Sequence, residues 1–317
     1  MARKPRPELA KSATVDELPR ACADEAEGVA FFERKRWGDS PACVHCGDVN
    51  VYQMKDRATG ERNKRFLWRC RGCGKQYTVR TGTVFEESLI PMHKWARVFW
   101  EAAKCKNGVS ALEISRTIGV SYKTALFMMH RVRWVMADDY SKPPKMTGIV
   151  EADETYIGGK PRYRGTLEKP LNKRGRGTKK QAVGAMVERG GSVRTRILPS
   201  VNSSNIQAMV RENVDQSARL MTDEFMSYNG LTEYAHERVN HRTREYARGD
   251  VTTNTVESFF ARVKRGINGT YHNVSREHLH RYLAQFEFAH NTRKMNDGER
   301  VCHLIDRVEG KRLRYEA

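Results

Sequence analysis

Two pairs of cysteines near the N-terminus constrain the fold of this 317-residue chain more than any other feature. Each pair has two intervening residues and a glycine directly after it, in CVHCG and CRGCG. Two such knuckles can place four thiolates around one tetrahedral Zn²⁺, whereas a redox CxxC needs no second copy. The flanking segments FLWRC and KQYTVRTGTVF have the residue types of short strands. We therefore predict a zinc ribbon with a leading helix over residues 25–88, its single structural ion bound by Cys43, Cys46, Cys70 and Cys73.

The charge of the chain points to a polyanionic partner. The formal net charge is +19 and the pI is near 9.8. Between Lys160 and Lys180, nine lysines or arginines stand against one glutamate, so we expect a mobile basic loop over 159–180 that binds phosphates through residues such as Arg162, Arg174 and Arg176. Neither a membrane-spanning apolar run nor the apolar core of a signal peptide is evident, which predicts a cytoplasmic, nucleoid-associated protein.

Residues 89–140 have the pattern of a helix-turn-helix. Ser110 and Ser121 can each cap a helix, and Gly119 between them can adopt the positive φ that the turn needs. In that geometry the second helix would enter the major groove of DNA and present Lys123 and Arg131 to it. The alternative is a plain helical hairpin that supports the core, and the basic residues favour the DNA-binding interpretation.

Three acidic residues in separate contexts suggest metal-dependent chemistry. Asp153 in GIVEADETYIGG and Asp223 in ARLMTDEF lie at or after strand-like runs, and Glu257 in TNTVESFFARVK opens an amphipathic helix, with Lys264 seven positions further on. Carboxylates placed in this way can converge on two Mg²⁺ ions, which activate water and stabilise the leaving oxygen in phosphodiester cleavage.

Spacing alone does not select these three acids. Strand alternation places Glu151 and Asp153 on one face and Glu154 on the other, and Glu224 directly follows Asp223. Asn254, three positions before Glu257, could serve as a substitute ligand or an orienting donor.

Four blocks in order along residues 30–295 resemble bacterial insertion-sequence transposases of the IS1595 type, whose ISXO2-like domain carries a DDE motif followed by a lysine. The blocks are the cysteine pairs, ALEISRTIGVSYKTALFMMHRVR, VEADETYIGG and NTVESFFARVKRGINGTYHNVSREHLHRYL. This resemblance implies an RNase H-like fold and selects Asp153, Asp223 and Glu257 as ligands of two Mg²⁺ or Mn²⁺ ions. It also implies that Lys264 holds a DNA phosphate as a point charge.

The predicted fold class is therefore multi-domain: a zinc ribbon, a helix-turn-helix region and an α/β RNase H-like domain. The expected boundaries are a disordered basic arm over 1–24, the ribbon over 25–88, the helix-turn-helix over 89–140, the catalytic domain over 147–295 and a C-terminal tail over 296–317.

The resemblance implies a DNA transposase that cuts at terminal inverted repeats and joins the 3′-hydroxyl to target DNA. Its partners would be double-stranded DNA and further copies of itself, as a dimer or a larger assembly on DNA. Two alternatives remain open: a zinc-ribbon and helix-turn-helix regulator with a silent RNase H-like domain, and a metal-dependent nuclease that hydrolyses DNA without joining it.

Overall fold

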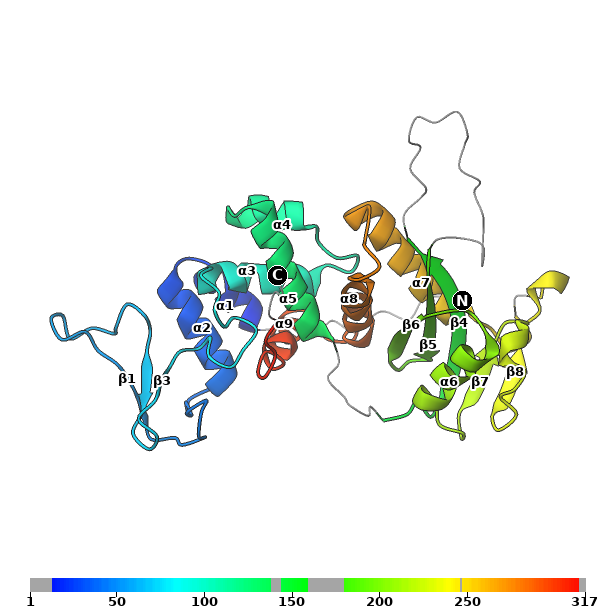
Figure 1. Ribbon diagram of the computed structural model, residues 1–317, viewed down its shortest axis with the longest axis horizontal. Helices are drawn as coiled ribbons and strands as arrows, with labels where there is room; N and C mark the ends of the chain where they lie inside the picture. The colour runs from blue at the N-terminus through cyan, green and yellow to red at the C-terminus, as the bar shows by residue number, and fades with distance from the viewer. Residues whose placement is uncertain (1–12, 138–143, 159–179, 246, 314–317) are drawn as a thin grey trace, which may run out of the picture. The chain divides into compact units, whose positions relative to one another are not determined.

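A computed structural model describes residues 13–137, 144–158, 180–245 and 247–313 (Figure 1). The chain divides into two compact units, one formed by Met1–Met136 with Thr292–Ala317 and the other by Ala137–Asn291. Most of the predicted basic loop, with Arg162, Arg174 and Arg176, lies outside the described residues. Among the helices that the structure describes, none is both long enough and apolar enough to cross a membrane.

The ribbon of the first unit is a small antiparallel sheet that is attached to the helix before it. Its strands, in the order β1-β2-β3, are Val51–Gln53, Trp68–Cys70 and Gln76–Tyr77, and the leading helix α2 is Glu25–Trp37. Trp37 of α2 packs edge-to-face on Trp68 and Tyr77. Glu33 of α2 accepts hydrogen bonds from the Trp68 indole at 2.7 Å and from the Arg62 guanidinium. The leading helix therefore packs against the ribbon's core through Trp37 and Glu33.

The helical part of the first unit contains the predicted helix-turn-helix. Its helices are α1 (Ala13–Ala21), α3 (Met92–Lys104), α4 (Ala111–Ile118), α5 (Tyr122–Met136) and α9 (Asp297–Ile305). Ser110 accepts a hydrogen bond from the Glu113 amide, and Ser121 accepts one from the Thr124 amide. Gly119 ends α4 with φ of 62°. The two serine caps and the glycine turn are confirmed.

The described residues near both ends of the chain are more ordered than the sequence predicts. Residues 13–21 form α1, so the predicted disordered arm over 1–24 is wrong for this part. The predicted C-terminal tail over 296–317 is also wrong for residues 296–313, which are structured. Asn296 and Glu299 form a capping box at the start of α9, and a β-bridge joins Glu309 to Thr83 in the segment after the ribbon. The bridge attaches the C-terminal segment to the chain after the ribbon, and α9 lies against α1, α2 and α3.

The second unit is a five-stranded mixed sheet with helices on both faces (Figure 1). In chain order its elements are β4 (Ile149–Ile157), β5 (Gln181–Glu188), β6 (Val193–Leu198), α6 (Ser203–Asn213), β7 (Arg219–Thr222), the short helix η2 (Met226–Tyr228), β8 (Ala235–Arg238), the short helix η3 (His241–Thr243), α7 (Asn254–Gly266), the π-helical turn η4 (Ile267–Tyr271) and α8 (Leu279–Asn291). The strand order is β6-β5-β4-β7-β8; the first three strands are antiparallel, and β4, β7 and β8 are parallel. This topology fits the predicted RNase H-like fold, and β8 is a strand that we did not predict.

The two cores of this unit determine which way each residue of β4 points. Val150 and Ala152 belong to the core cluster that contains the buried residues of α6. Ile157 belongs to the other cluster, with the buried residues of α7 and α8. Because side chains alternate along a strand, Glu151 and Asp153 lie on the α7 face of the sheet, and Glu154 lies on the α6 face.

Candidate metal centres

The four predicted zinc ligands form a compact group of thiols. All four Sγ atoms lie within 4.8 Å of one another, and the Cys43–Cys73 and Cys46–Cys70 pairs are each separated by 3.7 Å. A tetrahedron with Zn–S bonds of about 2.3 Å has S–S edges of about 3.8 Å. The His45 and Cys73 amides donate to Cys43 Sγ and Cys70 Sγ at 3.4 Å, as expected for turns that hold thiolates. The distances and donors therefore fit one structural zinc ion.

Asp153 is the most buried of the three predicted catalytic acids. Its pKa is raised to about 7, first by burial and then by the negative charges of Asp223 and Glu257, while the Glu154 amide and Lys264 oppose the shift. The Glu154 amide donates to Asp153 Oδ1 at 2.7 Å. Both other acids and the predicted lysine thus lie close enough to Asp153 to act on its charge.

Asp223 follows β7 at the point where this strand runs beside β4. The parallel register pairs Glu151 with Met221, and two positions further along come Asp153 and Asp223. The Phe225 amide donates to Asp223 Oδ1 at 3.0 Å. Burial raises the pKa of Asp223. The negative charge of the neighbouring Glu224 raises this pKa further, and His241 lowers it.

Glu257 lies in the first turn of α7, and its side chain is 49% exposed. The Thr253 hydroxyl donates to Glu257 Oε1 at 2.8 Å, and His241 Nε2 lies 3.6 Å from the same oxygen. His241, which also acts on the charge of Asp223, is a site residue that we did not predict. It is the first residue of η3, which begins shortly after the unpredicted strand β8 ends at Arg238. No sequence motif that we recognised includes His241.

The rival acids have other partners. Glu154 accepts a hydrogen bond from the buried Tyr228 hydroxyl on the α6 face, and Glu224 accepts one from the His241 amide. Glu151 is fully buried and bonded to Arg189 and to the first turn of α7. Asn254 is exposed at the start of α7, and its backbone N–H donates to the Thr252 hydroxyl. On the α7 face of β4, Asp153 is therefore the acid left for a ligand.

The carboxylates of Asp153, Asp223 and Glu257 are the type of ligand that divalent metal ions such as Mg²⁺ prefer. Mg²⁺ and Mn²⁺ prefer carboxylate oxygens, and a cation would relieve the repulsion that Asp223 and Glu257 exert on Asp153. Within the described ranges, the four cysteines are the only group of three or more potential ligands whose donor atoms all lie within 4.8 Å. The oxygens of the three acids are therefore farther apart than the four sulfurs. This spacing is compatible with two ions about 3.5–4 Å apart that share the three ligands.

The predicted DNA contacts differ in exposure. Lys123 at the start of α5 and Lys264 on α7 are exposed. Arg131 is only 6% exposed, and its guanidinium donates to the Val84 carbonyl at 2.7 Å and to the Glu86 carbonyl at 3.1 Å. The prediction that Arg131 reads DNA is therefore wrong, because this part of α5 faces the interior and Arg131 links it to the segment after the ribbon.

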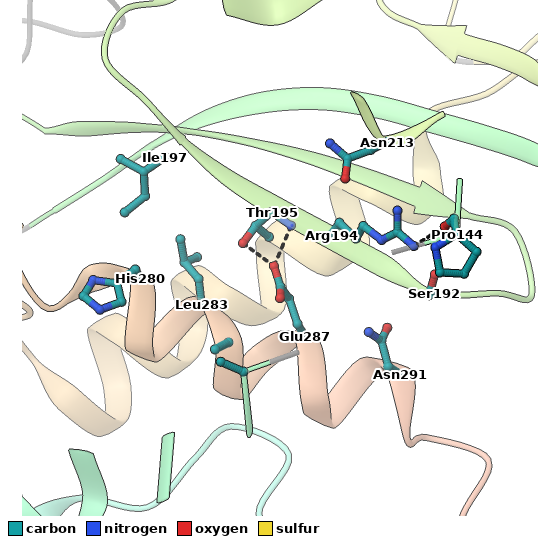
Figure 2. A pocket seen from close by; sticks show the side chains of 12 residues that line it. Pro144, Ser192, Arg194, Thr195, Ile197, Asn213, His280, Leu283, Glu287 and Asn291 are labelled. Carbon is teal, nitrogen blue, oxygen red and sulfur yellow. Dashed lines mark hydrogen bonds between the residues drawn. The ribbon is translucent and has the colours of Figure 1, made fainter. Parts of the chain in front are cut away.

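The second unit also has a cavity of about 540 Å³ between β6 and α8 (Figure 2). Glu287 of α8 accepts hydrogen bonds from the Thr195 amide and hydroxyl, and Asn291 bonds to the Val193 amide and carbonyl. These side chains satisfy backbone groups of β6, an edge strand that would otherwise expose them. No predicted catalytic residue lines this cavity, so it is separate from the carboxylate site.

Comparisons with known proteins match both units. Residues 145–291 match the ISXO2-like transposase domain, and residues 23–76 match the transposase zinc-ribbon domain. An uncharacterized protein in transposable element ISH50 of Halobacterium salinarum is 29% identical over 275 residues, which are 83% of this chain and 90% of that protein. An uncharacterized transposase-like protein of Haemophilus influenzae is 31% identical over 101 residues, which are 31% of this chain and 80% of that protein.

A solved structure, a pre-cleavage Mos1 transpososome, aligns with 63% of this chain and 71% of its own chain at 12% identity. Its TM-score of 0.26 is too low for a conclusion about the fold.

Proposed function

The chain belongs to the IS1595 family of DDE transposases, and from this membership we propose that it cuts DNA at the terminal inverted repeats of an insertion sequence and joins the 3′-hydroxyl to target DNA. The observation that supports this reaction is the convergence of three acids: the parallel register of β4 and β7 brings Asp153 and Asp223 to the same end of the sheet, and the charges of Asp223 and Glu257 both act on Asp153. A regulator with a silent domain would have no use for three acids brought together from β4, the end of β7 and α7.

Asp153, Asp223 and Glu257 would hold two Mg²⁺ or Mn²⁺ ions. Such ions lower the pKa of a bound water and stabilise the charge on the attacking and leaving oxygens of an in-line displacement. The protein contributes the placement of the acids on a rigid sheet and on the helix packed against it. Thr253 and His241, which contact Glu257 Oε1, would limit the rotamers of this half-exposed side chain.

DNA contacts would come from both units. Lys264, exposed on α7 seven positions after Glu257, would hold a phosphate near the acids, and Lys123 would contact the terminal repeat. Arg162, Arg174 and Arg176 would add contacts to phosphates without sequence preference. Joining two element ends requires at least a dimer on DNA, and these substrates would place the protein at the nucleoid in the cytoplasm.

The test is a cleavage and joining assay on a labelled terminal-repeat duplex with Mg²⁺ or Mn²⁺. Asp153→Asn, Asp223→Asn and Glu257→Gln should each abolish cleavage and strand transfer while DNA binding persists, since the amide keeps the shape and removes the charge that binds metal. Glu212→Gln, which removes an exposed carboxylate from α6, should keep wild-type activity.

The products separate the proposal from its two alternatives. Cleavage without joining would indicate a nuclease, and binding to the terminal repeat without any cleavage would indicate a regulator. Wild-type activity in any one of the three amide variants would remove that residue from the site.

A further inference from the structure

A second carboxylate on the α7 face of β4 is bonded to the helix that carries Glu257. Glu151 is 0% exposed, and it lies two residues before Asp153 on the same face of the strand. Its Oε2 accepts hydrogen bonds from the Thr255 amide at 2.7 Å and the Val256 amide at 3.0 Å. The Thr255 hydroxyl donates to Oε1 at 2.8 Å.

These bonds replace the cap that α7 lacks. The first amides of a helix have no partner within the helix and usually bond to the side chain of the N-cap residue. The N-cap of α7 is Thr253, and within the described structure its side chain makes no capping bond. The Thr253 hydroxyl bonds to Glu257 instead, and Glu151 of the neighbouring strand satisfies the helix amides.

Arg189 completes the connection. Its Nε lies 2.6 Å from Glu151 Oε1, which compensates the buried negative charge. Its other two nitrogens donate to the Asp250 carbonyl at 2.7 Å and the Thr252 carbonyl at 3.0 Å, in the segment that leads into α7. One ion pair therefore holds both the entry to the helix and its first turn against β4.

We infer that Glu151 and Arg189 are positioning residues that set the distance between Glu257 and Asp153 and so the affinity of the catalytic site for divalent metal. This inference rests on the proposed function, because it assumes that Glu257 and Asp153 are metal ligands. A buried ion pair contributes little net stability compared with an apolar replacement, since desolvation offsets its attraction. Three bonds from Glu151 to the first turn of α7 and two from Arg189 to the segment before it do fix the position and rotation of this turn, which carries Glu257 directly after Val256.

The test is Mn²⁺ binding to the zinc-loaded full chain, measured by calorimetry. Glu151→Gln keeps the size of the side chain but replaces one acceptor oxygen with a donor, so it cannot serve both the helix amides and Arg189. Substituting a residue that orients a metal ligand typically weakens metal binding about 10- to 100-fold, and we expect a loss in this range. Hydrogen exchange at the amides of Thr255, Val256 and Glu257 should also become faster.

Glu188 offers a matched control. Its Oε1 accepts hydrogen bonds from the Thr147 and Gly148 amides, which precede β4 in the same unit and are not part of α7. Glu188→Gln therefore changes a partly buried carboxylate that, like Glu151, accepts two backbone amides, and it should leave both Mn²⁺ affinity and exchange in the first turn of α7 unchanged. Arg189→Lys keeps the charge but not the three-way bonding, and it serves as a milder variant if Glu151→Gln does not fold.

Wild-type Mn²⁺ affinity in the folded Glu151→Gln variant, or in Arg189→Lys if the former does not fold, would overturn the positioning role. An equal loss in Glu188→Gln would also overturn it, because the effect would then be general destabilisation. Failure of the proposed function gives a different result, since Asp153→Asn and Glu257→Gln would then bind Mn²⁺ as the wild type does.

Discussion

Arg131 and Lys123 lie eight positions apart on α5, and their surroundings are opposite. Arg131 is buried with its guanidinium bonded to the Val84 and Glu86 carbonyls, and its guanidinium carbon lies 4.5 Å from the centre of the Phe127 ring. Lys123 is exposed in the first turn. We therefore predict that Arg131→Met destabilises the fold and that Lys123→Met weakens DNA binding.

The magnitude follows from the lost contacts. Methionine retains much of the apolar stem but removes two hydrogen bonds from a charged donor, each worth about 1.5–3 kcal/mol, and a cation–π contact worth about 0.5–2 kcal/mol. Because such values are not additive, we expect a total of about 3 kcal/mol. For a unit of this size, this loss corresponds to a fall in Tm of roughly 6–12 °C. Lys123→Met should change stability by less than about 0.5 kcal/mol.

Two measurements on the zinc-loaded protein check the pair. Thermal unfolding should show the loss for Arg131→Met alone. Binding to a terminal-repeat duplex at several salt concentrations should show that Lys123→Met reduces the slope of log K against log salt by about one, as expected for one lost phosphate contact. An Arg131→Met protein with wild-type Tm and a selective loss of affinity for the terminal repeat would refute this reasoning and restore Arg131 as a DNA-reading residue.

Two further predictions concern the metal centres. Cys70→Ser should release the zinc ion and unfold the ribbon, because ligation free energy is folding free energy in so small a module; full helical and ribbon stability in zinc-free, reduced protein would contradict this. Asp153→Asn should stabilise the zinc-loaded protein in buffer without Mg²⁺ or Mn²⁺, because the folded-state pKa of about 7 lies above the ordinary aspartate value of 3.8. The unfolded chain releases this proton above about pH 4, whereas the folded protein holds it until about pH 7, so the loss of stability builds up over this range and is constant above it. The gain in Tm should therefore be largest near pH 8 and vanish near pH 4. A lower Tm than the wild type at pH 8 would be the contrary result.

The features predicted correctly from the sequence are those set by local chemistry. Four cysteines in two knuckles define a metal site whatever surrounds them, and Ser110 and Gly119 act on the helix ends beside them. The strands that carry or precede the acids were also found, because their apolar runs are bounded by turn residues. These predictions did not require knowledge of which elements pack together.

The features that were missed depend on tertiary contacts. The pattern of α5 did not show that the interior surrounds its second half, so Arg131 was grouped with the exposed Lys123. The strand β8 has a short and mostly polar sequence, AHER, and its place is fixed by parallel pairing with β7. His241, which follows it, could therefore not be connected with Glu257 before the sheet was known.

Glu151 and Asp153 show why alternation alone could not separate a candidate ligand from a structural acid. Both face α7 from the same strand, and both are carboxylates largely shielded from water. Their roles differ because Glu151 meets the amides of the first turn of α7 and the Arg189 guanidinium, which compensate its charge. Asp153 is buried near two other acids, and its burial first and their charges second raise its pKa more than the Glu154 amide and Lys264 lower it, so its ionised form destabilises the metal-free protein. A residue that costs stability in this way is expected where charge is needed for binding, so the electrostatic penalty at Asp153 is itself an argument for a metal site.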